Sequence, residues 1–141
     1  MREDVGQQLV SAVRARDFDA LAACFAAGAR VRILTPRSLR ELEGPEAAAD
    51  RFRAWFGDAD GFELLDAEVT PVADRLRIRW HTRGRNPDKG WQENDHTGYA
   101  EVEKGKIVTL NVSCAGFRPA SAPPGGRSRP DPPPAHGVGA W

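Results

Sequence analysis

Apolar residues near the start of the chain recur at the spacing of a helix. They stand at i, i+4, i+7 and i+8: Val5, Leu9, Ala12 and Val13. This spacing predicts a helix over Glu3–Arg16 with one buried face. Asp17 then suits the N-cap of a short second helix, which we expect to end at Gly28. The N-terminal third is therefore predicted to be mainly helical.

A third helix is predicted to begin at Gly44-Pro45, because proline suits the first helical position, and to end at Gly57. Its apolar stripe is Ala48, Phe52, Trp55 and Phe56. The predicted strands are Ala29–Thr35, Leu39–Glu43, Phe62–Val72, Leu76–Arg83, Trp91–Val102 and Lys106–Phe117. This order indicates an α+β fold, in which a cone-shaped, curved antiparallel sheet wraps around three helices of the N-terminal half.

The hairpin registers decide which side chains face the inside of the sheet, because side chains alternate across a strand. The last hairpin is predicted to turn at Glu103-Lys104-Gly105, a three-residue loop with a bulge. That register pairs Ala100 with Val108, Gly98 with Leu110, His96 with Val112 and Asn94 with Cys114. It turns an apolar set inward: Val108, Leu110, Val112 and Cys114.

The hairpin before it supplies an independent register. A loop near residues 86–90 pairs Trp80 with His96 and Ile78 with Gly98, so that small residues face bulky ones. On the outer face the same register pairs Arg75 with Glu101, His81 with Asp95 and Arg83 with Glu93. The arginines of this strand are therefore interpreted as a solvated, self-neutralised face rather than a nucleic-acid surface.

Composition narrows the functional classes. The 141 residues hold 20 basic and 20 acidic side chains, and this balance argues against nucleic acid as a partner. No apolar run approaches a membrane span, and the charged start lacks a signal-peptide pattern, so we expect a cytoplasmic protein without membrane contact. Cys24 and Cys114 are expected to be reduced and buried. The sequence around Asp58–Gly61 lacks the downstream ligands of a calcium loop, and no metal site is predicted.

The composition changes after residue 117. The segment holds seven of the eleven prolines and almost no large apolar residue. Such a segment cannot bury enough surface to offset its ordering entropy. We therefore expect one domain over residues 1–118 and a disordered tail over residues 119–141.

Three local motifs resemble the nuclear-transport-factor-2-like superfamily, which includes SnoaL-like polyketide cyclases and ketosteroid isomerases. Asp17–Leu21 followed by Cys24-Phe25 and Ala29–Val31 resembles its helical opening. Leu42–Ala47 is similar to its entry to the third helix, and Val102–Ile107 to its last turn. The resemblance covers about residues 5–117. It implies a cone-shaped SnoaL-like α+β barrel with a pocket at its open end, no cofactor, and often a homodimer through the outer sheet face.

The resemblance also excludes one mechanism. Ketosteroid isomerases hold an oxyanion and shuttle a proton with three polar groups, and the matching positions here are Leu9, Gly98 and Ile33. None of these side chains can hold or move a proton. Ketosteroid isomerase chemistry is therefore not expected.

His96 is the candidate catalytic residue, because it is predicted to point inward and its ordinary pKa suits proton transfer. The candidate ligand-binding residues are Trp80, Asn94, Trp55, Leu110, Val112 and Cys114. A structural role is an open alternative: His96 could be a core histidine bonded to Asn94 or a carbonyl, and the tryptophans could be core fillers. Glu41 and Glu43 are possible acids at the rim.

Two functions fit these observations. The first is an acid/base cyclase, isomerase or hydratase acting on a small apolar, polyketide-like molecule without a cofactor. The second is a non-catalytic ligand-binding or dimeric interaction module of the same fold.

Overall fold

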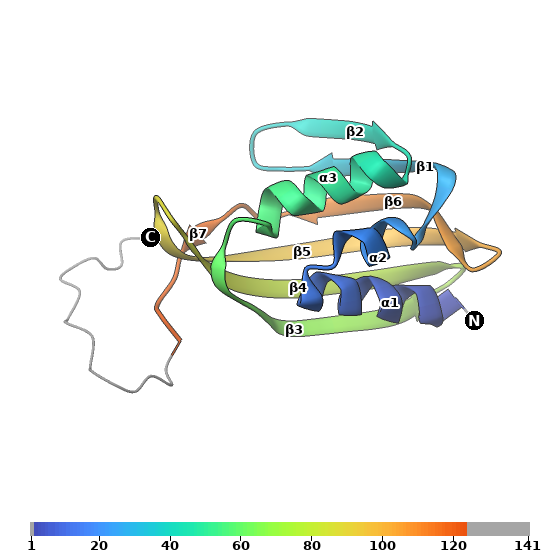
Figure 1. The fold of residues 1–141 in the computed structure, drawn as a ribbon. Coiled ribbons are helices and arrows are strands. Elements are labelled where there is room, and N and C mark those ends of the chain that lie inside the picture. The colour runs from blue at the N-terminus through green and yellow to red at the C-terminus, as the bar shows by residue number, and fades with distance from the viewer. Residues whose placement is uncertain (1, 124–141) are drawn as a thin grey trace.

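The computed structural model describes residues 2–123, and these form a layer of helices on one face of a long curved sheet (Figure 1). In chain order the elements are α1 (Arg2–Ala15), α2 (Phe18–Ala22), β1 (Phe25–Leu34), β2 (Leu39–Glu43), α3 (Pro45–Phe56), β3 (Asp60–Val72), β4 (Arg75–Asn86), β5 (Gly90–Glu103), β6 (Lys106–Cys114) and β7 (Arg118–Pro119). Of the tail predicted over residues 119–141, residues 119–123 are described, and residues 124–141 lie outside the described residues.

The sheet is open, with the strand order β2-β1-β6-β5-β4-β3. Strands β1 and β6 pair in parallel, and the other pairs along this path are antiparallel. All three helices lie on the same side of the sheet (Figure 1). The predicted α+β fold class is confirmed, with helices in the N-terminal half and a curved sheet that does not close.

Helix α1 packs one apolar stripe against β3 and β4. Its buried residues are Val5, Gly6, Leu9, Val10, Ala12 and Val13. Gly6 allows the close approach, because a Cβ there would stand 2.7 Å from Val69 Cγ1 and 2.8 Å from Leu76 Cδ2. The predicted stripe therefore fixes how α1 lies on the sheet.

Asp17 caps α2 as predicted, because its Oδ1 accepts the backbone N–H of Ala20 at 3.0 Å. The prediction that this helix ends at Gly28 is wrong, since α2 stops at Ala22 and β1 already begins at Phe25. Phe25 is buried and pairs in parallel with Ile107 of β6. The apolar residues are spaced as in a helix up to Phe25, but pairing with β6 makes Phe25 the first residue of a strand.

Helix α3 has the predicted ends. Gly44 precedes it with φ 94°, Pro45 occupies its first turn, and the N–H of Gly57 donates to Arg53 O at 2.7 Å. Its buried residues are Ala48, Ala49, Phe52 and Phe56. Trp55, the remaining residue of the predicted stripe, is half-buried. This helix therefore carries two aromatic residues near its C-terminal end.

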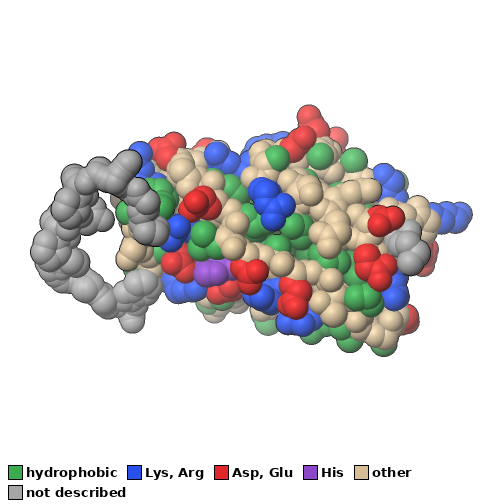
Figure 2. All heavy atoms as spheres, turned by 90° about the horizontal axis from the view of Figure 1, so that it is seen from below, with side chains coloured by type: hydrophobic (Ala, Val, Ile, Leu, Met, Phe, Trp, Pro, Cys, Tyr) green, Lys and Arg blue, Asp and Glu red, His purple; other side chains and the backbone are tan. Residues whose placement is uncertain are grey.

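The predicted register of β4 and β5 is confirmed. Trp80 lies opposite His96, and Ile78 lies opposite Gly98. Their outer faces carry charges of opposite sign: Arg75 Nη2 is 3.2 Å from Glu101 Oε2. Further pairs reach β3, with Arg79 3.0 Å from Asp66, Arg83 2.8 Å from Glu63 and Arg85 3.2 Å from Asp60. On the face of the molecule shown in Figure 2, acidic and basic side chains are mixed.

The predicted register of β5 and β6 is wrong by two residues. Lys104 (φ 53°) and Gly105 (φ 76°) form a two-residue turn in which both φ angles are positive, and Glu103 therefore pairs with Lys106. The predicted three-residue turn is therefore wrong. The structure pairs His96 with Cys114, Gly98 with Val112 and Ala100 with Leu110.

A bulge in the same hairpin decides the inner face of β6. The ladder shifts between Glu101 and Val102, which leaves Val108 without a partner and only half-buried. Ile107 is buried in place of the predicted Val108. The other inward positions hold as predicted: Leu110, Val112 and Cys114.

Strand β7 brings the chain back to the sheet after β6. Arg118 pairs with Glu93 and Pro119 with Gln92 of β5. Two further backbone bonds flank this pairing, from Ala115 N to Asp95 O at 2.9 Å and from Ala120 N to Trp91 O at 3.0 Å. The start of the proline-rich segment therefore lies along the end of β5 that adjoins the β4–β5 turn.

Candidate functional site

His96 lies on the inner face of β5 inside a cluster of aromatic rings, and it is fully buried. Its imidazole stacks on Trp80, with ring centroids 5.2 Å apart and ring planes 15° apart. The ring of Trp55 lies 4.2 Å away and that of Phe56 5.8 Å away. The structure therefore brings together three of the predicted site residues: His96, Trp80 and Trp55.

The imidazole of His96 has no polar partner among residues 2–123. Neither Nδ1 nor Nε2 makes a hydrogen bond, and the same holds for Nε1 of Trp80 beside it. Burial lowers the pKa of His96 from 6.5 to about 3, and the charge of Asp95 only partly opposes this. The imidazole is therefore neutral at physiological pH, with one N–H and one lone pair available.

Asn94 does not satisfy His96, although that pairing was one of the structural roles considered for the histidine. Its Nδ2 donates to Cys114 Sγ at 3.4 Å, and the thiol lies 3.8 Å from Asn94 Oδ1. Both side chains are buried. They form a separate polar pair next to the histidine, since Cys114 lies opposite His96 in the sheet.

Leu110 and Val112 lie farther along β6, opposite Ala100 and Gly98. Both are buried within the hydrophobic core. Leu9 and Ile33, two positions that hold polar groups in the isomerase scheme, are also fully buried. These side chains therefore fill the interior of the cone around Leu9, Ile33, Leu110 and Val112.

A small hollow opens at the end of the cone, just outside the aromatic cluster. Its volume is about 80 Å³. Trp55 and Phe56 line the hollow and also contact His96. The other apolar and hydroxyl-bearing walls include Ala54, Ala59, Phe62, Thr82 and Phe117. We call this space the mouth hollow.

Of the residues that line the mouth hollow, only Trp55 was predicted as a site residue, and the walls not predicted include Phe62, Thr82 and Phe117. Thr82 could have been found, because it shares the inward alternation of Ile78 and Trp80 on β4. Phe117 could not, since the pairing of β7 with β5 brings it to the mouth. Glu41 and Glu43, considered as rim acids, instead line a hollow on β1 and β2 with Arg30 and Arg32.

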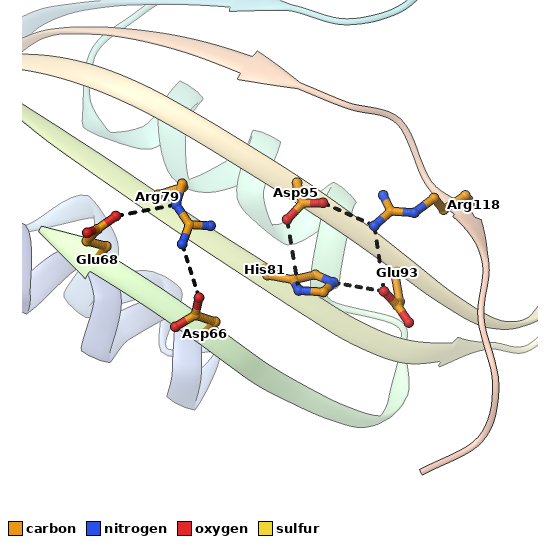
Figure 3. A network of polar contacts seen from close by, with 7 residues as sticks. All are labelled: Asp66, Glu68, Arg79, His81, Glu93, Asp95 and Arg118. Carbon is orange, nitrogen blue, oxygen red and sulfur yellow. Dashed lines mark hydrogen bonds and ion pairs between the residues drawn. The ribbon is translucent and has the colours of Figure 1, made fainter.

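A second polar cluster lies on the opposite face of the sheet (Figure 3). His81 Nε2 is 2.8 Å from Glu93 Oε1, and its Nδ1 is 3.9 Å from Asp95 Oδ1. Arg118 contacts the same two carboxylates, at 3.6 Å and 3.0 Å. Within residues 2–123 no group of three or more histidine, cysteine or acidic side chains is arranged to hold a metal ion. The contacts in this cluster are therefore ion pairs and hydrogen bonds.

The described part of the chain also lacks a helix long and apolar enough to cross a membrane.

A curved open sheet with three helices on one face, and a hollow at its open end, defines the nuclear-transport-factor-2-like class of fold. The model of the SnoaL-like domain family matches residues 7–110. The chain belongs to this family.

Solved structures show the same fold at low sequence identity. A candidate polyketide cyclase from Xanthomonas campestris pv. campestris is 18% identical over 79% of this chain and 88% of its own, with a TM-score of 0.65. One from Sinorhizobium meliloti is 23% identical over 77% and 93%, with a TM-score of 0.58. A protein with a ketosteroid isomerase-like fold from Catenulispora acidiphila DSM 44928, in complex with trimethylamine, is 11% identical over 79% of this chain and 85% of its own, with a TM-score of 0.63. No curated protein matches the chain.

Proposed function

We propose that this SnoaL-like protein binds a small, flat, largely apolar molecule at the mouth of the cone, and that His96 is the group that handles a proton there. The observation that carries the proposal is the buried imidazole with two unpaired nitrogens among aromatic rings. An unpaired polar group at this depth costs about 1–3 kcal/mol. A ligand oxygen that reached the imidazole would remove that cost.

The chemistry of a neutral imidazole decides the reaction class. With its pKa lowered to about 3 by burial, His96 is a weak base in the closed site but keeps an N–H that can donate. Donation to a carbonyl oxygen stabilises the negative charge that this oxygen gains when a neighbouring C–H gives its proton to solvent water, and the N–H stays on the imidazole. The proposal is therefore a cyclase, isomerase or hydratase step that passes through an enol, on a polyketide-like ketone. Asn94 and Cys114 form a buried, neutral polar pair beside the histidine.

One observation favours the second candidate, a binding module without catalysis. Catalytic imidazoles are held in one tautomer by a partner on the second nitrogen, and His96 has no such partner among the described residues. The aromatic walls alone are sufficient to bind a flat ligand. The experiment must therefore measure binding and proton transfer separately.

2-Tetralone, a flat apolar ketone with exchangeable α-hydrogens, tests both functions. Tryptophan fluorescence measures its binding, because Trp55 and Trp80 flank His96. Deuterium uptake at its α-carbon, followed by NMR in D2O, measures proton transfer. We expect the wild type to bind the ketone and to accelerate uptake, and His96→Phe to lose about a hundredfold of that acceleration.

The control is Arg79→Ala, which removes ion pairs with Asp66 and Glu68 on the outer face and should leave both quantities unchanged. Binding without acceleration would establish the non-catalytic module instead. No binding of 2-tetralone, together with equal behaviour of wild type and His96→Phe, would count against the proposed site.

We also propose that a second copy of this chain covers the outer sheet face. An apolar hollow of about 570 Å³ lies there between Leu34, Leu39 and Tyr99. Beside it, the hollow between Arg30, Arg32 and the glutamates of β2 carries both signs of charge. A surface with both signs can complement itself across a two-fold axis.

A further inference from the structure

The mouth hollow is too small for the ligand that the proposed function requires. Its volume of about 80 Å³ holds only about three water molecules. Pockets for organic ligands generally measure about 300–1,000 Å³. His96 is also fully buried behind Trp55 and Phe56. A ligand can therefore reach the imidazole only if one wall of the hollow moves.

The wall formed by the connection from α3 to β3 is pinned. Arg16 Nη1 donates to Ala59 O at 2.6 Å and to Phe56 O at 3.0 Å. The same guanidinium lies over the ring of Phe62, 5.0 Å from its centroid. Thr82 and Gln92 belong to the continuous ladder of β4 and β5. These walls are therefore held by several strong interactions each.

A further wall is Phe117, which lies on residues 115–120, here called the C-terminal strap. Its side chain is 42% exposed although it lines the hollow. Gly116 has φ 95°, a conformation that favours glycine, and this turns the chain from β6 toward β7. The backbone of the strap bonds to β5 at Asp95 and Trp91, on either side of the short β7 pairing.

One side chain ties the strap to the outer face of the sheet. Arg118 Nη2 lies 3.0 Å from Asp95 Oδ2 and 3.6 Å from Glu93 Oε1 (Figure 3). His81 contacts the same two carboxylates from β4. The arginine follows Phe117 directly in the chain. Its ion pairs therefore decide how firmly the phenylalanine is held over the hollow.

We propose that Phe117 is the movable wall of the mouth hollow and limits the size of the ligand, and that Arg118 is the positioning residue that holds it closed. This inference rests on the proposed function for its ligand, but the attachment of the strap is a property of the protein alone. The experiment therefore has one arm without ligand and one with it.

Hydrogen exchange by NMR tests the attachment without ligand. In Arg118→Ala, the amides of Ala115 and Ala120 should exchange about two- to fivefold faster than in the wild type, the range expected for a part-exposed ion pair. High salt should remove the difference, because it screens the same pairs. Arg118→Lys should restore part of the protection, because a charge remains.

Arg79→Ala is the matched control for this arm. Arg79 also contacts two carboxylates on the outer sheet face, Asp66 at 3.0 Å and Glu68 at 3.5 Å, and none of them touches the strap (Figure 3). Its loss should leave the exchange of Ala115 and Ala120 unchanged. Equal exchange in Arg118→Ala and Arg79→Ala would overturn the positioning role of Arg118.

2-Tetralone tests the movable wall. Phe117→Ala should bind it several-fold faster in stopped-flow tryptophan fluorescence, because a ring that limits entry is gone. The control is Leu65→Ala, since Leu65 is an apolar side chain of similar exposure, 39%, that does not line the mouth hollow. If Phe117→Ala and Leu65→Ala bind the ketone at the wild-type rate, Phe117 is no gate. If the wild type itself does not bind it, the proposed function fails, and hydrogen exchange alone decides whether Arg118 holds the strap.

Discussion

The indole of Trp80 and the imidazole of His96 stack across β4 and β5, with 5.2 Å between their ring centroids. Close packing of the next layer supports this contact, because Gly98 leaves room for Leu110 and Val112 from β6. A Cβ at Gly98 would stand 3.0 Å and 3.1 Å from those two side chains. The stack is thus held by the register of the sheet, while its ring nitrogens have no polar partner among the described residues. The arrangement combines a rigid ring position with unused hydrogen-bonding capacity.

The buried imidazole should make the stability of the protein depend on pH. Burial lowers the pKa of His96 from 6.5 to about 3, so between these values the unfolded chain binds a proton that the folded chain does not. The free energy of unfolding therefore falls as the pH falls through this window, by about 1.4 kcal/mol per pH unit at most. Urea denaturation should show a loss of about 2 kcal/mol between pH 6.5 and about pH 5 from this group.

His96→Phe should lack this contribution, because it has no group to protonate. The difference in unfolding free energy between the wild type and His96→Phe should grow by the same amount over that pH range. A pH dependence that is identical in the wild type and His96→Phe would show that the imidazole is already charged or hydrated in the folded protein.

The stacked pair could be predicted because two independent signals agree on β4 and β5. The alternation from Leu76 to Thr82 separates an apolar face from a basic one, and acidic residues on β5 match the basic side chains. Charge pairing and apolar packing therefore select one register. The family motifs point to the same cone. The position of His96 inside the cone thus follows from local pattern alone.

The rest could not be predicted, for physical reasons that differ between elements. At Lys104, a non-glycine residue adopts φ 53°, which shortens the turn and moves the pairing of β6 by one residue, and the bulge between Glu101 and Val102 moves it by one more. At Phe25, parallel pairing with β6 overrides a helical spacing, which no local signal reveals. Phe117 is one wall of the mouth hollow, and its position is set by the pairing of β7 with β5. The composition of the sequence around β7 predicts a disordered tail and gives no sign of this pairing.

Cys24 should be inert in the folded protein. Burial raises the pKa of its thiol from 9.0 to about 11, with Lys106 partly opposing this. The thiolate fraction at pH 8 is then about a hundredfold below that of an ordinary cysteine, and the thiolate is the reactive form. Alkylation with iodoacetamide followed by peptide mapping should label Cys24 about a hundredfold more slowly in the native state than in guanidinium. Native labelling at the unfolded rate would mean that the α2–β1 junction opens readily.

Gly6 should resist replacement by alanine, although alanine ordinarily favours a helix by about 1 kcal/mol. The added Cβ would stand 2.7 Å from Val69 and 2.8 Å from Leu76, so α1 would have to move away from the sheet. Overpacking of this kind costs about 1–3 kcal/mol. Gly6→Ala should therefore lower the free energy of unfolding by about 1 kcal/mol net. Gly28→Ala is the control, because nothing lies within 4 Å of its added Cβ, and a higher melting temperature for Gly6→Ala would contradict the packing of α1.

A dimer through the outer sheet face should depend on the apolar residues exposed there. Leu34 is 57% exposed, Leu39 50% and Tyr99 41%, and all three line one hollow. A charge placed in an apolar contact between two copies would be buried without a partner, which is strongly unfavourable. Tyr99→Glu should therefore shift the protein to a monomer in sedimentation velocity at micromolar concentration.

Leu65→Glu introduces the same charge at an exposed apolar site of β3 outside this hollow, and it should sediment like the wild type. A wild type that sediments as a monomer at all concentrations would refute the dimer, and equal dimerisation of Tyr99→Glu would place the contact on another face.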